Sequence, residues 1–284
     1  MLTRRPRPIR PHTFPQNLKR RRLPRSVKAV TMAAGFVCRD GLVLAADRQF
    51  TSLTVGHTYQ ECKLSELRWN NGLAIWGYSG SPDVARRVNE ELGKRFNQGT
   101  TVIRADIEHT LTSALKDASI GKKEFFGILF GAWTEAEEPI LFSSSAATVS
   151  PVPRCEVIGS GDSPLARYLR GLCLRMEPLS VWQASVLGMY FILQGKTYDG
   201  QFIGGPTDVF VIDKNRKRHE IGVASSRVWE TALEMIDQQI ATLFSVFTDA
   251  EMFDRARTEA LFKFAGKAEL FGNQVRALRA KESV

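Results

Sequence analysis

Hydrophobic residues along the chain form short apolar runs and helical stripes, which together predict alternating groups of strands and helices. The first two runs, TMAAGFVC and LVLAAD, are separated by Arg39-Asp40-Gly41. Asp-Gly between two apolar runs is typical of a β-hairpin. Further apolar runs predict strands at 72–80, 124–133, 139–144, 155–161 and 208–213.

Apolar residues at helical spacing predict helices between these strands. Ser81-Pro82-Asp83 places a hydroxyl and a proline where helices commonly begin. Apolar residues then recur every four positions, at Val84, Val88, Leu92 and Phe96. Similar patterns predict helices at 105–118, 163–175 and 179–194, and from Ser225 almost to the end of the chain. Because the strands come in adjacent groups, the order favours an α+β fold with two sheets sandwiched between helical layers over a doubly wound parallel sheet.

Positive charge is concentrated at the start of the chain. Residues 1–30 contain ten of the 39 lysines and arginines, five of the twelve prolines, and no Asp or Glu. Since the whole chain has a net charge of +9, residues 31–284 carry a net charge of −1. We therefore predict a basic, proline-rich arm or propeptide at 1–30, disordered until something binds it, and a folded domain at 31–284. The composition of the arm also suits an organelle transit peptide.

The rest of the composition argues against several classes of protein. The arm lacks the apolar stretch of a secretory signal, and no later run of about eighteen apolar residues predicts a membrane span. The four cysteines lie far apart, which fits buried, reduced thiols in a cytoplasmic protein. The histidines have no metal-ligand spacing, and neither a P-loop nor a GxGxxG motif occurs. We expect no metal and no cofactor, and ATP use only by a partner.

Three polar residues stand at equal intervals across the first β-rich stretch. Thr31 and Asp47 are sixteen residues apart, as are Asp47 and Lys63. A two-residue turn at Asp40-Gly41 would place Asp47 opposite Ala34, on the face away from Thr31. A three-residue turn would place Asp47 opposite Ala33, with Thr31 as its diagonal neighbour on the same face. Both turns are common in hairpins, so the geometry leaves both registers open.

The chemistry of the three side chains is coherent. A threonine hydroxyl is a weak nucleophile unless a base lies beside it, and a free α-amine on the same residue is such a base. An ammonium from Lys63 would lower the pKa of that amine and help to acidify the hydroxyl. Asp47 would hold Lys63 charged and oriented. By spacing alone, the three residues are also compatible with structural roles in strands.

These residues resemble the start of proteasome β-subunits and of the related bacterial HslV-type peptidase. The two intervals match that family's nucleophile, aspartate and lysine, and Asp47-Arg48-Gln49 is similar to the HslV form of the aspartate motif. Gly80-Ser81-Pro82-Asp83 resembles the family's glycine-to-helix turn beside the oxyanion hole. Ile158-Gly159-Ser160-Gly161 resembles the segment with its serine near the nucleophile. The resemblance covers about residues 30–90 and 155–213.

The resemblance implies an N-terminal-nucleophile hydrolase with a four-layer αββα sandwich and a long helical C-terminus. Removal of the propeptide would make Thr31 the first residue of a threonine peptidase acting on peptides or unfolded proteins. Asp47, Lys63 and Ser160 would assist Thr31, and backbone N–H groups around Ser79 and Gly80 would stabilise the oxyanion. Members of the family form homo-oligomeric rings, often served by an ATP-driven unfoldase.

The chain departs from the family pattern in three places. Val30 stands where the family usually has glycine, and its β-branch restricts attack on its carbonyl by the Thr31 hydroxyl. Within 198–205, Ile203 takes the place of the family's second serine and Asp199 is one position away from that of its second aspartate, so neither is assigned. Translation from Met32 would remove the threonine altogether.

A second class of function therefore stays open beside the peptidase. The chain would then be an unprocessed, catalytically silent member of the fold that serves assembly or interaction. Its basic arm at 1–30 would bind nucleic acid or an acidic partner through phosphate-type contacts.

Overall fold

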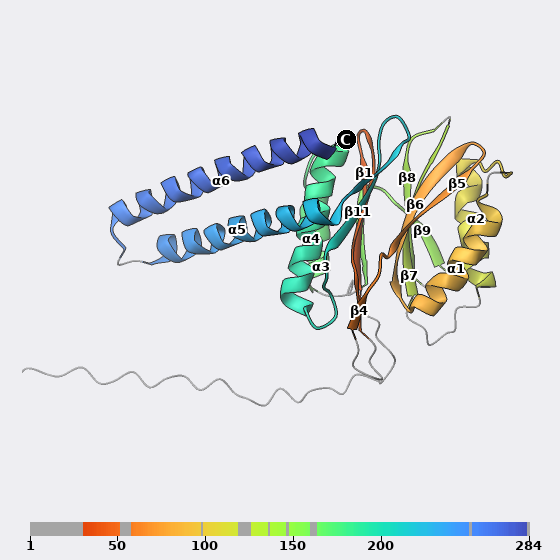
Figure 1. Cartoon of the computed structure of the whole chain (residues 1–284), viewed down its shortest axis with the longest axis horizontal. Coiled ribbons are helices and arrows are strands. Elements are labelled where there is room, and N and C mark those ends of the chain that lie inside the picture. The colour runs from red at the N-terminus through yellow and green to blue at the C-terminus, as the bar shows by residue number, and fades with distance from the viewer. Residues whose placement is uncertain are drawn as a thin grey trace, which may run out of the picture.

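Two five-stranded antiparallel sheets form the centre of the protein (Figure 1). The structure is a computed structural model and describes residues 31–51, 58–97, 99–118, 126–135, 137–145, 148–159, 164–249 and 252–282. The arm predicted at 1–30 lies outside the described residues.

The first sheet has the order β10-β1-β2-β11-β12, formed by Cys155–Gly159, Met32–Cys38, Gly41–Asp47, Thr207–Ile212 and Arg218–Ile221. The second has the order β5-β6-β7-β8-β9, formed by Leu64–Trp69, Gly72–Gly80, Phe126–Thr134, Ile140–Ser145 and Thr148–Val152. A short ribbon pairs β3 (Gln49–Thr51) with β4 (Thr58–Gln60).

Helices lie on the outer side of each sheet. In Figure 1, α1 and α2 flank the sheet that contains β6, whereas α3 and α4 flank the sheet that contains β1. The helix bounds are Pro82–Arg95 for α1, Arg104–Asp117 for α2, Pro164–Leu174 for α3, Val181–Asp199 for α4, Val223–Thr248 for α5 and Asp254–Glu282 for α6. Helices α5 and α6 form a long hairpin that projects away from the sheets (Figure 1). The fold is thus mixed α and β with antiparallel sheets, as the order of elements predicts.

The hydrophobic core has three parts because each sheet is apolar on both faces. One cluster joins β1 and β2 to α3, α4 and α5, with Phe36 and Trp229 among its largest side chains. A second joins β6 and β7 to α1 and α2. The third lies between the two sheets and includes Leu44, Ile75 and Leu129. Strands buried on both faces read as continuous apolar runs, which explains the runs noted in the sequence.

The first hairpin has a register that differs from both predicted ones. Its two-residue turn is Arg39-Asp40, and Gly41 is already the first residue of β2, paired with Cys38. Gly41 is required by a close approach: a Cβ there would lie 2.0 Å from the carbonyl oxygen of Ile212 on β11. Asp40 uses its carboxylate to accept the Val181 N–H at 2.8 Å, at the N-terminus of α4. Both predicted registers are therefore wrong.

Most predicted elements are present, and the C-terminal helix is divided. The runs assigned to strands overlap β1, β2, β6, β7, β8, β10 and β11, and the helical stripes overlap α1 to α4. The short strands β3, β4, β5, β9 and β12 were not predicted. The expected single long helix is two helices, because the chain is extended at Asp249, which follows Thr248; both are weak helix formers. No helix within the described residues is both long enough and apolar enough to cross a bilayer.

Candidate active site

The peptide group that joins Thr31 to Met32 is held from both sides. Its N–H donates to Asp47 Oδ1 at 3.0 Å, and its carbonyl oxygen accepts a long hydrogen bond of 3.5 Å from the Ser79 hydroxyl. Asp47 lies at the end of β2 and Ser79 near the end of β6, so one residue comes from each sheet. Thr31 and Ser79 are both buried. The structure therefore fixes the position of Thr31 at the edge where the two sheets meet.

Gly159 packs directly against the same carbonyl group. It pairs with Met32 at the end of β10 and has a φ of +107°, in the region that favours glycine. A Cβ at this position would lie 1.6 Å from the carbonyl oxygen of Thr31 and 3.0 Å from Ser79 Oγ. Only glycine fits here without moving Thr31.

We expect Gly159→Ala to destabilise the fold and to displace Thr31. The unfavourable φ alone costs about 1–3 kcal/mol, and the clash with a backbone atom adds to this cost. Urea unfolding monitored by tryptophan fluorescence would measure the change. The matched control is Gly171→Ala in α3, where an added Cβ meets nothing within 4 Å. Gly171→Ala should be neutral or stabilising by up to about 1 kcal/mol, and equal stability of the two variants would contradict this account of Gly159.

Asp47 and Lys63 form a fully buried ion pair next to Thr31. Lys63 Nζ lies 2.9 Å from both carboxylate oxygens of Asp47 and 2.5 Å from the carbonyl oxygen of Gln49. The same ammonium lies 4.4 Å from the centre of the Phe50 ring. Asp47 also accepts backbone N–H groups from Met32 at 3.0 Å, Gln49 at 3.0 Å and Gly204 at 3.3 Å. The carboxylate thus has four donors, which is what a buried charge requires.

Burial opposes the charge on both members of this pair. It raises the pKa of the Asp47 carboxyl, while Lys63 and the Met32 N–H counteract the rise. It also lowers the pKa of the Lys63 ammonium, while Asp47 counteracts the fall. A lysine with a lowered pKa gives up a proton more readily than one in water. The contact between the two groups therefore opposes the effect of burial on each of them.

The structure brings together four of the six predicted site residues. Thr31, Asp47 and Ser79 share the contacts described above, and Lys63 is joined to them through Asp47. Gly80 is the last residue of β6 and has a φ of +132°; no contact places it on Thr31, and the oxyanion role of the Ser79 and Gly80 N–H groups stays a prediction. Among the described residues, no hydrogen bond joins Lys63 to the Thr31 hydroxyl. Ser160 lies outside the described residues.

Two supporting contacts could not be found by spacing in the sequence. Arg48 forms a bidentate pair with buried Asp208, with Nε and Nη2 at 2.6 to 2.8 Å from the carboxylate. The carbonyl of Gly204 accepts the N–H groups of Arg48 and Gln49, both at 3.1 Å, while its own N–H reaches Asp47. The segment where sequence comparison gave no aspartate or serine therefore supports the site through its backbone. The only sequence signal was an acidic residue, Asp208, beginning an apolar strand.

The cysteines offer no competing nucleophile at this site. Cys38, Cys155 and Cys173 are buried, and Cys62 is half-buried, with its thiol donating to the carbonyl of Leu64. Burial, together with the nearby Asp208 carboxylate, raises the pKa of Cys62 to about 12, so it stays a thiol. Within the described part of the chain, no group of three or more His, Cys, Asp or Glu residues is arranged to hold a metal ion.

Comparisons with known proteins place this geometry on a known fold. No protein-family model matches the chain, and no curated protein matches it. Solved structures of Anbu do. Anbu from Yersinia bercovieri, described as the ancestral beta-subunit, matches with a TM-score of 0.63 and 13% identity over 78% of this chain and 100% of that one. The chain has the fold of Anbu.

Two further Anbu structures agree with this assignment. Anbu from Hyphomicrobium sp. strain MC1 matches with a TM-score of 0.59 and 19% identity, over 79% of this chain and 100% of that one. Anbu from Pseudomonas aeruginosa, solved as a helical assembly, matches with a TM-score of 0.56 and 15% identity, over 73% of this chain and 96% of that one. At these identities the likeness shows a common fold.

The structural matches correct the relationship inferred from the motifs. The sequence resemblance named proteasome β-subunits and the HslV-type peptidase, whereas the matching structures are of Anbu, a distinct family. The identification as an HslV-type protein is therefore wrong. The motifs misled because the intervals between Thr31, Asp47 and Lys63 reflect a hairpin and a sheet edge, which different families with this fold can share.

Proposed function

We propose that this protein is a threonine hydrolase that acts on peptide bonds once Thr31 has become the N-terminal residue. The observation that carries the proposal is the double hold on the peptide group after Thr31, by Asp47 from one sheet and by Ser79 from the other. These two hydrogen bonds fix the main chain of Thr31 beside a buried ion pair. The buried Asp47–Lys63 pair supplies the polar environment beside it.

The proposed chemistry depends on the liberated amine. In the full chain the nitrogen of Thr31 is an amide, which cannot act as a base. After cleavage before Thr31, its α-amine would accept the hydroxyl proton as the oxygen attacks a substrate carbonyl. The amine would then protonate the leaving nitrogen, and water would hydrolyse the acyl-enzyme. Lys63 would favour the neutral amine and stabilise negative charge on the Thr31 oxygen.

The remaining assignments form part of the same proposal. Backbone N–H groups at Ser79 and Gly80 would bind the oxyanion. Ser160 would hydrogen-bond near the Thr31 amine, and the contact of its neighbour Gly159 with Thr31 supports that position. The two sheets and their outer helices would be the four-layer αββα sandwich of N-terminal-nucleophile hydrolases. Residues 1–30 would be the propeptide, and the site would act on peptides or unfolded cytoplasmic proteins supplied by an ATP-dependent unfoldase.

An intact-mass measurement tests the proposal. The purified protein should have lost residues 1–30 and begin at Thr31, and that form should hydrolyse at least one member of a fluorogenic peptide library. Hydrolysis by a chain that retains residues 1–30 would contradict the mechanism, because its Thr31 nitrogen would be an amide.

A specific observation also favours the second candidate, an unprocessed protein that serves assembly. The three acceptors around Lys63 Nζ are Asp47 Oδ1, Asp47 Oδ2 and the carbonyl of Gln49, which use its three protons without Thr31. The residue before Thr31 is valine, which hinders self-cleavage. In this reading the Asp47–Lys63 pair is structural.

We also propose that the protein forms a homo-oligomer, and the α5–α6 hairpin supports this part of the proposal. Ile240, Phe244 and Phe247 recur at helical spacing along α5 and are 39%, 68% and 47% exposed. Beyond the end of α5, Phe253 is 83% exposed, and Phe262 on α6 is 74% exposed. An apolar stripe on a projecting hairpin is unfavourable in water unless another surface covers it. A second copy of the chain, packed hairpin against hairpin, would cover it.

Replacing Phe244 and Phe247 together by serine should lower the oligomeric mass. We expect light scattering after size exclusion to show a smaller species for the double variant at the same concentration, because two buried aromatic contacts would be lost from each subunit. The matched control is Val228→Ser, another exposed apolar residue of α5 near its start. An unchanged mass for the double variant would exclude this stripe as the interface.

A further inference from the structure

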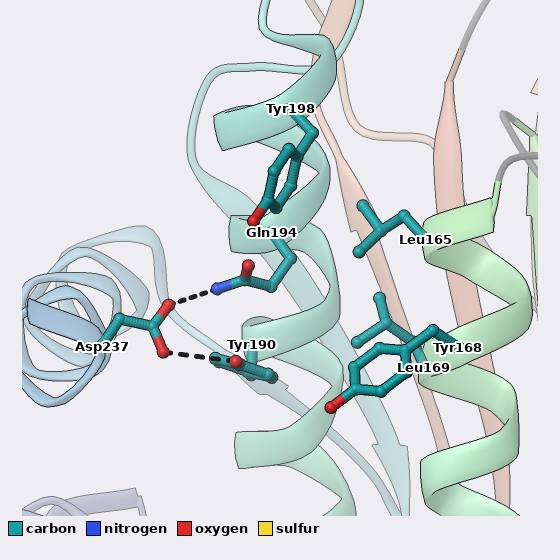
Figure 2. Close-up of a pocket in the computed structure, with 7 residues that line it drawn as sticks. All are labelled: Leu165, Tyr168, Leu169, Tyr190, Gln194, Tyr198 and Asp237. Atoms are coloured by element: carbon teal, nitrogen blue, oxygen red, sulfur yellow. Dashed lines mark hydrogen bonds between the residues drawn. The ribbon is translucent and has the colours of Figure 1, made fainter. Parts of the chain in front are cut away.

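A cavity with polar and apolar walls lies between α3, α4 and α5, away from the Thr31 site. It has a volume of about 390 Å³ and is lined by Leu165, Tyr168, Leu169, Tyr190, Gln194, Tyr198 and Asp237. Figure 2 shows the two walls: the side chains from α4 with Asp237 of α5 on one side, and those from α3 on the other. Tyr190, Gln194 and Tyr198 follow one another at four-residue intervals, so they form a single stripe along α4.

Asp237 and Gln194 offer hydrogen-bond acceptors to the cavity. Asp237 accepts the Tyr190 hydroxyl at 3.2 Å and the side-chain N–H of Gln194 (Figure 2). Burial, with Asp237 adding to its effect, raises the pKa of Tyr190 to about 12, so this hydroxyl keeps its proton and stays a donor to Asp237. The Gln194 carbonyl oxygen and the second lone pairs of Asp237 remain available. These acceptors suit a ligand that brings N–H donors.

The charge of the cavity favours a cationic ligand. Asp237 is a half-buried carboxylate with two neutral donors, and no ion pair involves it among the described residues. No lysine or arginine lines the cavity. A cation bound in the cavity would form a charge-assisted hydrogen bond with this carboxylate.

Tyrosine rings complete the features of a cation site. Tyr168 and Tyr198 are 66% and 69% exposed, although both lie at the cavity. The face of an aromatic ring attracts guanidinium and ammonium groups, and this attraction adds to that of a nearby carboxylate. A compact organic cation would contact these rings and Asp237 together.

We propose that this cavity binds an arginine or lysine side chain from residues 1–30 of the same chain. That segment has ten such side chains and no acidic residue, whereas the rest of the chain carries a net charge of −1. It joins the fold at Thr31, next to Met32, and a Cβ at Gly195 would lie 2.5 Å from Met32 Sδ. Gly195 follows Gln194 on α4, so Met32 lies against the same helix as the cavity. Thirty residues of chain reach much farther than this, at roughly 3.3 Å per residue.

The inference is independent of the proposed hydrolase activity. The cavity would hold the arm in an unprocessed assembly protein as well as in a peptidase precursor. In a precursor, it would keep the segment before Thr31 on the surface of the fold until cleavage. The experiment therefore uses a structural readout and no enzyme assay.

Photo-crosslinking in the full chain tests the proposal. Tyr198 is replaced by the photoreactive p-benzoylphenylalanine in a Thr31→Ala background that keeps the arm attached, and intact mass confirms that residues 1–30 are present. After irradiation, peptide mapping should find crosslinks from position 198 to residues 4–28. Asp237→Asn, which preserves the shape of the side chain, should reduce their yield about fivefold. Millimolar agmatine, a free guanidinium compound, should reduce it as well.

The control variant changes a residue on α5, the helix that carries Asp237. Glu234→Gln removes an equal charge from α5 outside the cavity and should leave the yield unchanged. Thermal unfolding of each variant verifies that it is folded. No crosslink to the arm, or equal yields for Asp237→Asn and the parent, would overturn the proposal. Crosslinks that join labelled to unlabelled chains in a mixture of ¹⁵N and ¹⁴N protein would overturn the assignment to the same chain.

Discussion

Thr31→Ala is expected to abolish peptide hydrolysis and to leave residues 1–30 attached. Alanine removes the hydroxyl that would attack both the Val30 carbonyl and a substrate carbonyl. It leaves the main-chain contacts of residue 31 with Asp47, Ser79 and Gly159 intact, because these involve only the peptide group. We expect a loss of at least about 10³-fold in kcat/KM, which is typical when a covalent nucleophile is removed.

Thr31→Ser is the matched control for this prediction. It keeps a hydroxyl and, after cleavage, an α-amine on the same residue, and it loses only one methyl group. We expect the serine variant to be processed and to retain measurable turnover with the same peptides. Intact mass separates the two steps: an alanine variant that is cleaved at Thr31 by another protease would still have no nucleophile. Residual turnover above about 1% of the parent in such a cleaved alanine variant would exclude Thr31 as the nucleophile.

The elements of the fold are predictable because their signals are local. Apolar runs and helical stripes locate β6 and α1 almost to the residue, since burial of one face is decided within each element. The register of the first hairpin is different. Gly41 is glycine because the main chain of β11 comes close to it, at Ile212. A contact between residues so far apart in the sequence has no local signal. The sequence therefore predicted two possible turns for this hairpin, and the turn in the structure, Arg39-Asp40, is neither of them.

The same distinction between local and long-range signals applies to the candidate site. Asp47 and Lys63 were predicted as a pair from chemistry and spacing, and they are in contact. Arg48 and Asp208 were not paired in advance, because their contact depends on how β2 aligns with β11. The role of Gly204 could not be predicted from the sequence either. It acts through its main-chain N–H and carbonyl groups, which do not depend on the type of side chain. Side-chain chemistry can be read from a sequence, whereas support by the main chain depends on the tertiary structure.

Lys63→Met is expected to lower both stability and activity, and the two effects can be separated. Methionine fills much of the same volume and removes the charge, which leaves Asp47 buried without its counter-ion. Breaking a buried ion pair in this way costs about 3–5 kcal/mol near neutral pH. Peptide hydrolysis should fall by at least about 10²-fold, because the amine and oxyanion of Thr31 would lose the adjacent cation.

The loss of stability in Lys63→Met should depend on pH in a defined direction. Burial raises the pKa of Asp47 even with Lys63 present, and it would rise further without the lysine. A carboxyl whose pKa is higher in the folded state binds more protons there, so stability is retained at low pH and declines as the pH rises through the folded pKa. The difference in free energy of unfolding between parent and variant should therefore be larger at about pH 8 than at about pH 5.

Lys196→Met is the matched control, because it removes the lysine of a different ion pair and leaves the Asp47–Lys63 pair intact. Lys196 is also largely buried and pairs with Glu230 at 2.5 Å, between α4 and α5. Its removal should lower stability in the same way, since Glu230 would lose its counter-ion, but peptide hydrolysis per folded molecule should stay close to that of the parent. Urea unfolding and peptide turnover on the same preparations measure both quantities. If the two lysine variants lose stability alike and Lys63→Met retains full turnover, Lys63 is a structural residue, and the second candidate function becomes the better account of the site.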